Sequence, residues 1–179
     1  MGHALPKAAA GYDHGMRNAL YRGALWLGYR ALILKWRLKR PTLHGAYVAV
    51  WHDGRLLLIR NSYKRGLTLP CGGLKRRESH RAAARRELAE EVGIEVPEEQ
   101  LRFSCEIRAR GRHADDWSKF FELECKEEPE IRIDQTEVVW AAFCPEEELS
   151  ERPLIAPVRL YLARRAEHPS GESKNENPG

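Results

Sequence analysis

Three glutamates near the end of one predicted helix are the residues best suited to chemistry in this sequence. Glu87, Glu90 and Glu91 are spaced so that their carboxylates project from one side of the helix. Like charges four residues apart destabilise a helix by roughly 0.2–0.5 kcal/mol, and carboxylates near its C-terminal end oppose its dipole. Arg85 and Arg86 offset part of this cost. Taken alone, the glutamates indicate an exposed helix covered by ion pairs, whereas a bound ligand would make them the acidic edge of a cleft.

Two glycines just before this helix favour the second interpretation. Gly72 and Gly73 permit a tight loop and a close approach of the backbone to an oxygen-rich ligand. The first of them opens the pattern G-x5-E-x7-R-E-U-x-E-E-x-G-U, in which U is a bulky aliphatic residue. The residues that fill the pattern are Gly72, Glu78, Arg86, Glu87, Leu88, Glu90, Glu91, Gly93 and Ile94. A chance match at a given start is on the order of 10⁻⁹ at ordinary amino-acid frequencies, which excludes coincidence.

This pattern is the Nudix box, and the chain resembles the Nudix hydrolases. The order of predicted strands around the box extends a weaker resemblance over about residues 42–165. The resemblance implies an α/β/α sandwich around a mixed β-sheet. It also implies an enzyme that acts on phosphorus-containing acid anhydrides, hydrolysing a phosphoanhydride bond in a nucleoside diphosphate linked to another group. The implied cofactor is Mg²⁺ or Mn²⁺.

The resemblance assigns roles to individual residues of the box. Glu87, Glu90 and Glu91 are expected to bind the metal, and Arg86 is expected to orient the carboxylates through a salt bridge, with Glu78 as its partner. The residue types suit this assignment, because hard divalent cations select carboxylate and carbonyl oxygens and Mg²⁺ shares its coordination sphere with substrate phosphates.

Three positions depart from the usual pattern of the family. Members often have glycine where this chain has Cys71 and Arg77, and glutamate where it has Lys75. The backbone carbonyl of the residue at position 71 often binds metal in the family, so Cys71 remains a predicted ligand through its main chain. Residues 75–77 form a basic loop, which either grips a polyphosphate or is a solvated turn.

Further candidates lie around the box. Glu137 matches an acidic residue that often precedes the corresponding strand in the family, and it is either a fourth metal ligand or an exposed turn residue. The resemblance implies that the base that activates water is a carboxylate, either of the box or of a loop outside it. The predicted contacts to substrate are made by Gly72 and Gly73, with Arg60 and Lys75 as further candidates.

The substrate beyond this class is left open. The proline, tyrosine and S-Q-P-W-P-F-P features that accompany ADP-ribose, dinucleoside polyphosphate and NADH selectivity in the family are absent from the expected region, which argues weakly against each. Two alternatives remain: a Nudix domain that binds nucleotides for regulation without turnover, and a pyrophosphohydrolase of RNA 5′ ends. A net charge of +4 is too small to demand a nucleic-acid partner.

The elements that must position these residues follow from the pattern of apolar residues. His52-Asp53-Gly54 is a hairpin signal between strands at 46–51 and 56–59. The box helix is predicted over 79–92, with Ser79 as its N-cap and Gly93 just past its end. Further strands are predicted at 101–107, 119–125 and 138–143, and short helices at 145–149 and 157–166. Strands interleaved with helices indicate an α/β domain.

An additional helix is predicted at residues 16–38. One apolar stripe runs along it: Leu20, Ala24, Leu27, Ala31, Leu34 and Leu38. Our preferred interpretation is that this stripe packs on protein, either on its own domain or, most simply, across a homodimer. The alternative is peripheral contact with a membrane, with basic residues at the lipid headgroups. Charges interrupt the apolar residues too often for a transmembrane helix.

The sequence divides into an N-terminal extension (1–41), a Nudix hydrolase domain (42–167) and a polar tail (168–179) that we expect to be disordered. Apolar residues make up 42% of the chain and charged residues 31%, as in globular proteins. Its four cysteines are widely spaced and form no metal-binding pattern. We therefore expect reduced thiols and a cytoplasmic location.

Overall fold

The structure is a computed structural model that describes residues 15–39, 41–110 and 114–167. The predicted disordered tail therefore lies outside the described residues. Two short 3₁₀ segments, Glu98–Gln100 and Glu146–Glu151, accompany the helices and strands. In chain order the helices and strands are α1 (Gly15–Lys39), β1 (Thr42–His52), β2 (Arg55–Asn61), β3 (Cys71–Gly73), α2 (His80–Val92), β4 (Arg102–Arg110), β5 (Asp115–Glu124), β6 (Val138–Pro145) and α3 (Ala156–Glu167).

A mixed sheet with strand order β4-β5-β1-β2-β6 forms the centre of the domain, and β3 pairs with β1 outside this order. The long β1 runs parallel to β5 and antiparallel to β2. The predicted hairpin joins β1 to β2, and both of its turn residues have positive φ, 47° at Asp53 and 69° at Gly54. Such a turn suits the right-handed twist of the two strands.

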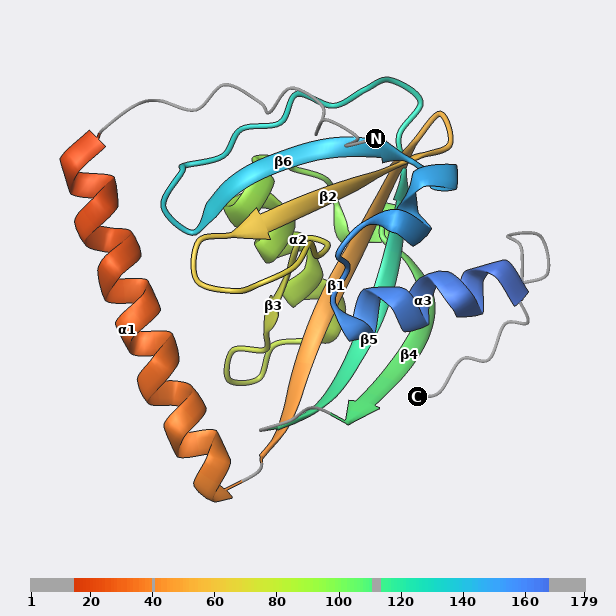
Figure 1. Ribbon diagram of the computed structural model, residues 1–179. Coiled ribbons are helices and arrows are strands. Elements are labelled where there is room, and N and C mark those ends of the chain that lie inside the picture. The colour runs from red at the N-terminus through yellow and green to blue at the C-terminus, as the bar shows by residue number, and fades with distance from the viewer. Residues whose placement is uncertain (1–14, 40, 111–113, 168–179) are drawn as a thin grey trace.

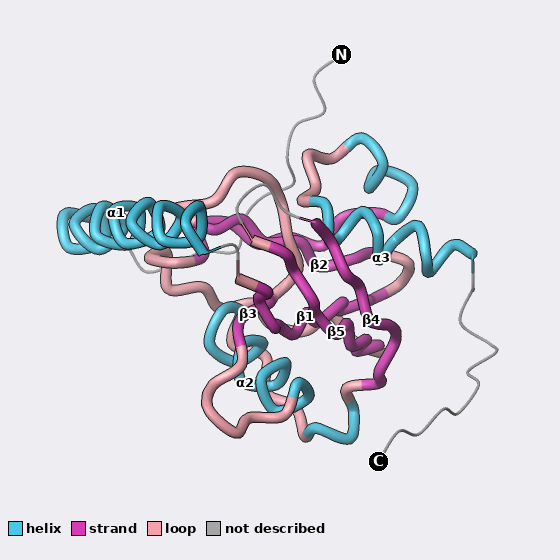
Figure 2. The backbone as a smooth tube through the Cα atoms, turned by 90° about the horizontal axis from the view of Figure 1, so that it is seen from below, coloured by secondary structure: helices cyan, strands magenta, loops and turns pink. Residues whose placement is uncertain are grey.

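Helices cover both faces of this sheet, as Figures 1 and 2 show. The alternation of side chains along β1 feeds two separate cores: Trp51 packs with Tyr161 of α3, whereas Val50 packs with Leu88 of α2. The predicted α/β/α sandwich around a mixed sheet is therefore confirmed. The predicted helix at 145–149 is a 3₁₀ segment instead, Glu146–Glu151.

The ends of α2 agree with the sequence signals. The Ser79 hydroxyl accepts a hydrogen bond from the Ala82 backbone N–H, and Gly93 adopts a left-handed conformation with φ 73°. Both features satisfy backbone groups that a helix end leaves without partners. They fix where α2 begins and ends, and hence where the three glutamates stand.

The long helix α1 stands beside the sandwich, as Figure 1 shows. Its predicted apolar stripe does not pack on its own domain: Leu20, Leu27 and Leu34 are 72%, 65% and 61% exposed. That part of the prediction is wrong, because the opposite side of the helix makes the contact, with Tyr29 against Tyr63. Among the described residues, no helix has the length and apolar character needed to cross a membrane.

Candidate active site

The last two turns of α2 carry the glutamates of the box against the short strand β3. Ala84, Leu88 and Val92 are fully buried and fix α2 on the sheet. The carboxylates on the neighbouring side of the helix differ in their exposure, because Glu91 is buried while Glu90 is exposed. One end of the carboxylate cluster is thus inside the domain and the other is at its surface.

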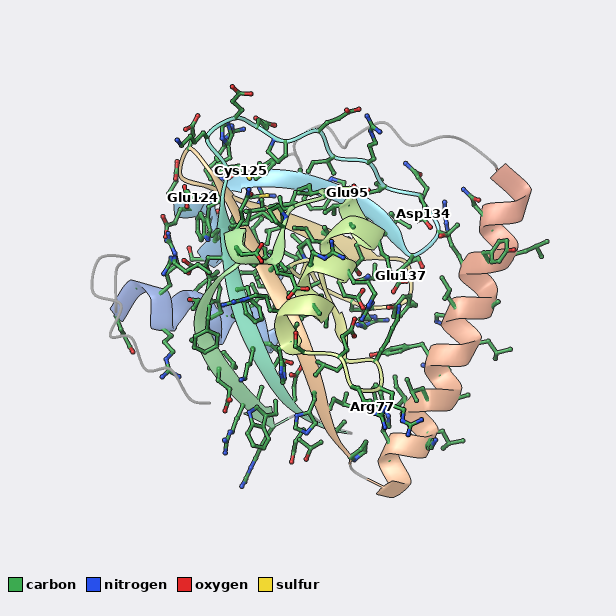
Figure 3. All side chains as sticks on the ribbon, turned by 180° about the vertical axis from the view of Figure 1, so that it is seen from behind. Arg77, Glu95, Glu124, Cys125, Asp134 and Glu137 are labelled. Carbon is green, nitrogen blue, oxygen red and sulfur yellow. The ribbon has the colours of Figure 1, made fainter. Side chains whose placement is uncertain are left out.

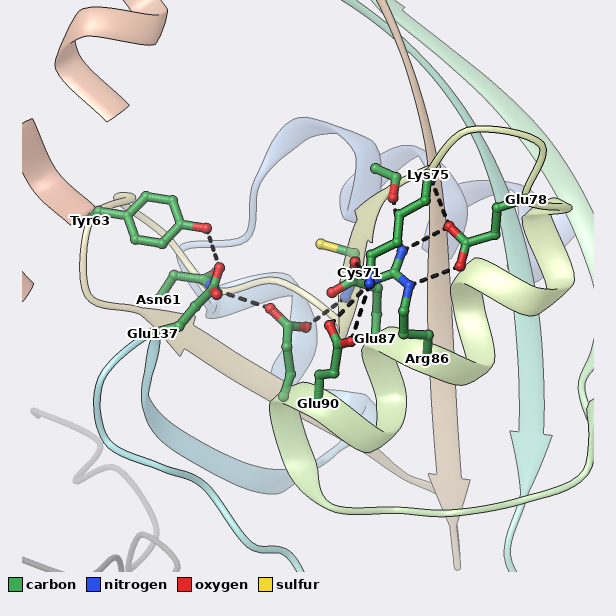
Figure 4. Close-up of polar contacts among 11 residues, drawn as sticks. Asn61, Tyr63, Cys71, Lys75, Glu78, Arg86, Glu87, Glu90 and Glu137 are labelled. Atoms are coloured by element: carbon green, nitrogen blue, oxygen red, sulfur yellow. Dashed lines mark hydrogen bonds and ion pairs between the residues drawn. The ribbon is translucent and has the colours of Figure 1, made fainter. Parts of the chain in front are cut away.

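Arg86 is the centre of an ion-pair network that Figure 4 shows. Its Nε and Nη2 donate to the two carboxylate oxygens of Glu78, at 2.8 and 2.9 Å, and its Nη1 donates to both Glu87 and Glu90. Nη2 also donates to the Gly73 carbonyl oxygen at 3.0 Å. The predicted salt bridge between Arg86 and Glu78 is present, and it joins α2 to the loop before it.

The Glu78 carboxylate connects Lys75, in the loop before α2, with Arg86 of α2. Besides Arg86, its carboxylate accepts a hydrogen bond from the Lys75 backbone N–H at 2.7 Å. The hydrogen bonds from Arg86 lower the pKa of Glu78 to about 2, and the Lys75 N–H contributes in the same direction. Glu78 is therefore ionised throughout the neutral range and keeps Arg86 oriented toward Glu87 and Glu90.

Glu91 is a buried carboxylate held by two donors. Its Oε2 accepts from the Cys71 backbone N–H at 2.8 Å, and its Oε1 accepts from the Asn61 side-chain amide at 3.3 Å. Burial, together with the negative charges of Glu87 and Glu137, raises the pKa of Glu91 to about 8, against the two hydrogen bonds, which lower it. Without a cation, this carboxyl gains a proton near neutral pH.

Glu87 lies in contact with the backbone of β3. A Cβ atom added to Gly72 would lie 1.9 Å from the Glu87 carboxylate, so only glycine fits there while Glu87 keeps its position. An added Cβ at Gly73 meets nothing closer than the His44 carbonyl oxygen at 3.9 Å, which is ordinary contact. Burial raises the pKa of Glu87, against the hydrogen bond from Arg86. The position of Glu87 therefore requires glycine at position 72, but not at position 73.

Sequence reasoning missed two residues that approach the cluster from β2 and the loop after it. Asn61 donates to Glu91, and the Tyr63 hydroxyl donates to Glu137 at 2.5 Å. The change from the apolar run 56–59 to polar residues at the end of β2 was the available signal. Figure 4 shows Glu137 beside Asn61 and Tyr63, at the end of the cluster away from Glu78.

The two basic candidates, Lys75 and Arg60, differ in their position relative to the carboxylates. The Lys75 ammonium lies 3.5 Å from the Glu90 carboxylate, so the basic loop reaches the exposed end of the cluster. Arg60 is exposed, and strand alternation places it on the same face as Leu58, which belongs to the core under α3. The structure therefore brings Lys75, but not Arg60, to the carboxylates. All four cysteines are free thiols.

The donor set fits a hard divalent cation. The carboxylates of Glu87 and Glu91 lie against the start of β3, and that of Glu90 lies at the exposed end of the cluster. Burial raises the pKa values of Glu87 and Glu91, and repulsion between the carboxylates adds to both shifts. In the arrangement described, Arg86 engages Glu87 and Glu90. No three acidic, histidine or cysteine side chains among the described residues stand close enough together to hold a metal ion. The carboxylates would therefore have to turn from Arg86 toward a cation.

Arg77 occupies an unfavourable backbone conformation in the basic loop, with φ 63°. It stands where the family often has glycine, which adopts this conformation without strain. Arg77→Gly should therefore raise the free energy of unfolding by about 0.5–1 kcal/mol, measured by urea denaturation. Arg76→Gly is the matched control, because Arg76 is equally exposed but has no positive φ, and it should be neutral or destabilising. Equal effects of the two substitutions would contradict this account of the loop.

The comparisons with known proteins agree with this geometry. The family model described as NUDIX domain matches residues 42–166. The chain therefore belongs to the Nudix family, and the prediction of a Nudix hydrolase is confirmed. A search of curated proteins found no match.

Solved structures share the fold at low sequence identity. The MutT protein from Methanosarcina mazei has a TM-score of 0.65 at 18% identity, over 74% of this chain and 99% of its own. The NUDIX domain of Shewanella oneidensis NrtR, complexed with ADP ribose, has a TM-score of 0.60 at 17% identity, over 70% and 88%. A Francisella tularensis bifunctional NMN adenylyltransferase/ADP ribose pyrophosphatase, complexed with AMP and a Mn ion, has a TM-score of 0.61 at 18% identity. The match covers 80% of this chain and 47% of that protein.

Proposed function

We propose that this protein hydrolyses a phosphoanhydride bond in a nucleoside diphosphate-linked substrate, with Mg²⁺ or Mn²⁺ as its cofactor. The observation that carries the proposal is the burial of Glu91 beside further carboxylates. A buried acidic side chain among like charges is unfavourable in the absence of a cation. A divalent cation bound there would remove that penalty.

Glu87, Glu90 and Glu91 would hold the cation, together with the backbone carbonyl of Cys71, and Glu137 is a further candidate. When bound, the ion would polarise the phosphoryl group and lower the pKa of a coordinated water. The Cys71 peptide already lies against Glu91 through its N–H, which keeps β3 and the end of α2 together.

The remaining groups would position the carboxylates and the substrate. Arg86, fixed by Glu78, holds Glu87 and Glu90 until ligands arrive and then keeps the loop closed through the Gly73 carbonyl. Lys75 lies at the exposed end of the cluster, where an ammonium group can contact a substrate phosphate. Gly72 leaves the room beside the backbone of β3 that the Glu87 carboxylate occupies.

Glu137 is our candidate for the base that accepts a proton from the attacking water. Its negative charge acts on both Glu87 and Glu91, and the Tyr63 hydroxyl orients its carboxylate. A base must lie within hydrogen-bond reach of the proton that it accepts, or reach it through one water. Figure 3 shows Glu137 on the side of the domain that faces α1, on the loop before β6.

The experiment that tests this function is a panel of nucleotides, including ADP-ribose, dinucleoside polyphosphates, nucleoside triphosphates and a 5′-triphosphorylated RNA. Each is incubated with Mg²⁺ or Mn²⁺, and products are identified as phosphate, pyrophosphate or nucleoside monophosphate. We expect metal-dependent turnover of at least one nucleoside diphosphate-linked compound, loss of activity in excess chelator, and recovery on adding either metal. Turnover that persists in excess chelator, or binding without turnover across the panel, would contradict the proposal.

A further inference from the structure

Helix α1 has two apolar faces that point in opposite directions. The face toward the domain carries the partly buried side chains Leu25, Tyr29, Ile33 and Trp36. On this side Tyr29 contacts the Tyr63 ring, with 5.2 Å between centroids. Near the N-terminal end of the helix, Arg22 donates to the Gln135 carbonyl oxygen at 2.9 Å. These contacts attach α1 to the domain and leave its other face free.

The free face is the outer stripe of Leu20, Ala24, Leu27, Ala31 and Leu34, all of which are exposed. At about 100° per residue, these positions fall within about 80° of arc, opposite the face that contacts the domain. Three exposed leucines in one line form a contiguous apolar surface, unlike the scattered apolar side chains of an ordinary protein surface. Such a surface is expected to be covered by a partner.

The charges beside the outer stripe define the chemistry of that partner. Six basic residues and no acidic residue occur between Gly15 and Lys39. Lys35 lies about 60° to one side of the stripe, and Arg30 and Arg37 lie about 80–100° to the other. The apolar stripe is therefore bordered by cationic side chains on both sides. Long basic side chains in such positions reach headgroups while apolar residues enter the acyl boundary.

A second copy of the chain fits this surface poorly. A two-fold symmetric interface places the same patch of each copy against the other. Two copies of α1 packed through their outer stripes would bring cationic borders together, with no acidic side chain on either helix to pair with them. An anionic surface has the complementary charge, so the charges decide between the two partners.

We propose that α1 lies on the surface of a membrane that contains anionic phospholipids. The outer stripe is inserted at the interface, the flanking basic side chains contact the lipid phosphates, and the opposite face of α1 stays on the Nudix domain. This proposal does not depend on the proposed hydrolytic function, because none of the residues of the outer stripe belongs to the carboxylate site. It replaces a homodimer as our account of the exposed stripe.

The test is sedimentation of the full-length protein with vesicles of phosphatidylcholine alone and of phosphatidylcholine with phosphatidylglycerol. We expect binding to the anionic vesicles only, weakened by added salt. Leu27→Gln with Leu34→Gln should reduce partitioning at least 10-fold. Leu160→Gln, at an exposed leucine of α3, is the matched control and should change nothing. Circular dichroism of each variant checks that the helix content is retained.

Two double variants that each remove two positive charges show whether binding depends on the basic residues beside the outer stripe or on net charge alone. Arg30→Gln with Lys35→Gln should weaken binding to anionic vesicles about 10-fold or more, whereas Arg110→Gln with Lys126→Gln removes the same charge elsewhere and should not. Absence of binding to anionic vesicles by the wild-type chain would overturn the proposal. A dimer in light scattering that the Leu27→Gln, Leu34→Gln variant dissociates would overturn it in favour of a second copy.

Discussion

Glu91→Gln is expected to lower kcat by at least about 100-fold in the presence of Mg²⁺, because the substitution removes a charged oxygen from the predicted metal site. Glu90→Gln should have an effect of the same order, although Glu90 lies at the exposed end of the cluster. Glu95→Gln is the control: Glu95 is exposed and lies just beyond α2, outside the box. Full activity in both the Glu90 and Glu91 variants would rule out the proposed site.

Glu91→Gln should at the same time stabilise the metal-free protein at high pH. Folding raises the pKa of Glu91 to about 8, so the folded state binds its proton more tightly than the unfolded chain does. Ionised Glu91 therefore lowers the free energy of unfolding. This loss of stability is absent below the unfolded pKa of about 4.5 and grows as pH rises toward 8. It reaches a few kcal/mol, on the order of 1.4 kcal/mol per pKa unit. Glutamine has no carboxyl group to ionise, and its amide can pair with Asn61, whose Oδ1 has no hydrogen-bond partner among the described residues.

The measurement is the melting temperature of both proteins in excess chelator between pH 5 and pH 9. Other titrating groups cancel in the difference between wild type and Glu91→Gln, so the difference should grow in favour of the variant as pH rises. Parallel curves of melting temperature against pH for wild type and Glu91→Gln would show that folding does not raise the pKa of Glu91 as described.

Gly72→Ala should reduce kcat about 100-fold or more with little loss of stability. The added Cβ would occupy the position of the Glu87 carboxylate, and a flexible side chain can move away without unfolding the domain. Displacing Glu87 removes a predicted ligand, which should have the effect of a direct substitution there. Activity and urea denaturation of the same preparations separate the two effects.

Gly73→Ala is the matched control for Gly72→Ala, since a Cβ at Gly73 meets only ordinary contacts. The neighbouring glycine should therefore tolerate alanine within a few-fold of wild-type activity. Equal losses in the two variants would mean that both glycines act through backbone freedom, and not through the space that Glu87 requires.

The site could be predicted from the sequence where its geometry depends on one helix. Spacings along α2 place Glu87, Glu90 and Glu91 together regardless of the rest of the fold, and Ser79 and Gly93 mark the ends of that helix by local hydrogen bonding. Arg86 and Glu78 were assigned through the box, and the ion pair between them is present. Local structure therefore carried most of the assignment.

The contributions of other elements could not be predicted, because tertiary packing determines them. Asn61 reaches Glu91 only because β2 ends beside α2, where the pairing of β2 with β6 shifts register between Arg60 and Asn61. The same limit applies to α1. Both of its faces carry large apolar side chains, so the periodicity that predicted the helix could not show which face contacts the domain.

The most direct test of the central claim is Mn²⁺ binding to the full-length, metal-free protein at pH 8, followed by electron paramagnetic resonance. The account predicts saturable binding that Glu91→Gln and Glu90→Gln each weaken at least about 10-fold, and that Glu95→Gln leaves unchanged. Wild-type affinity in the Glu91→Gln and Glu90→Gln variants, or equal weakening by Glu95→Gln, would contradict the claim that the carboxylates at the end of α2 hold the metal.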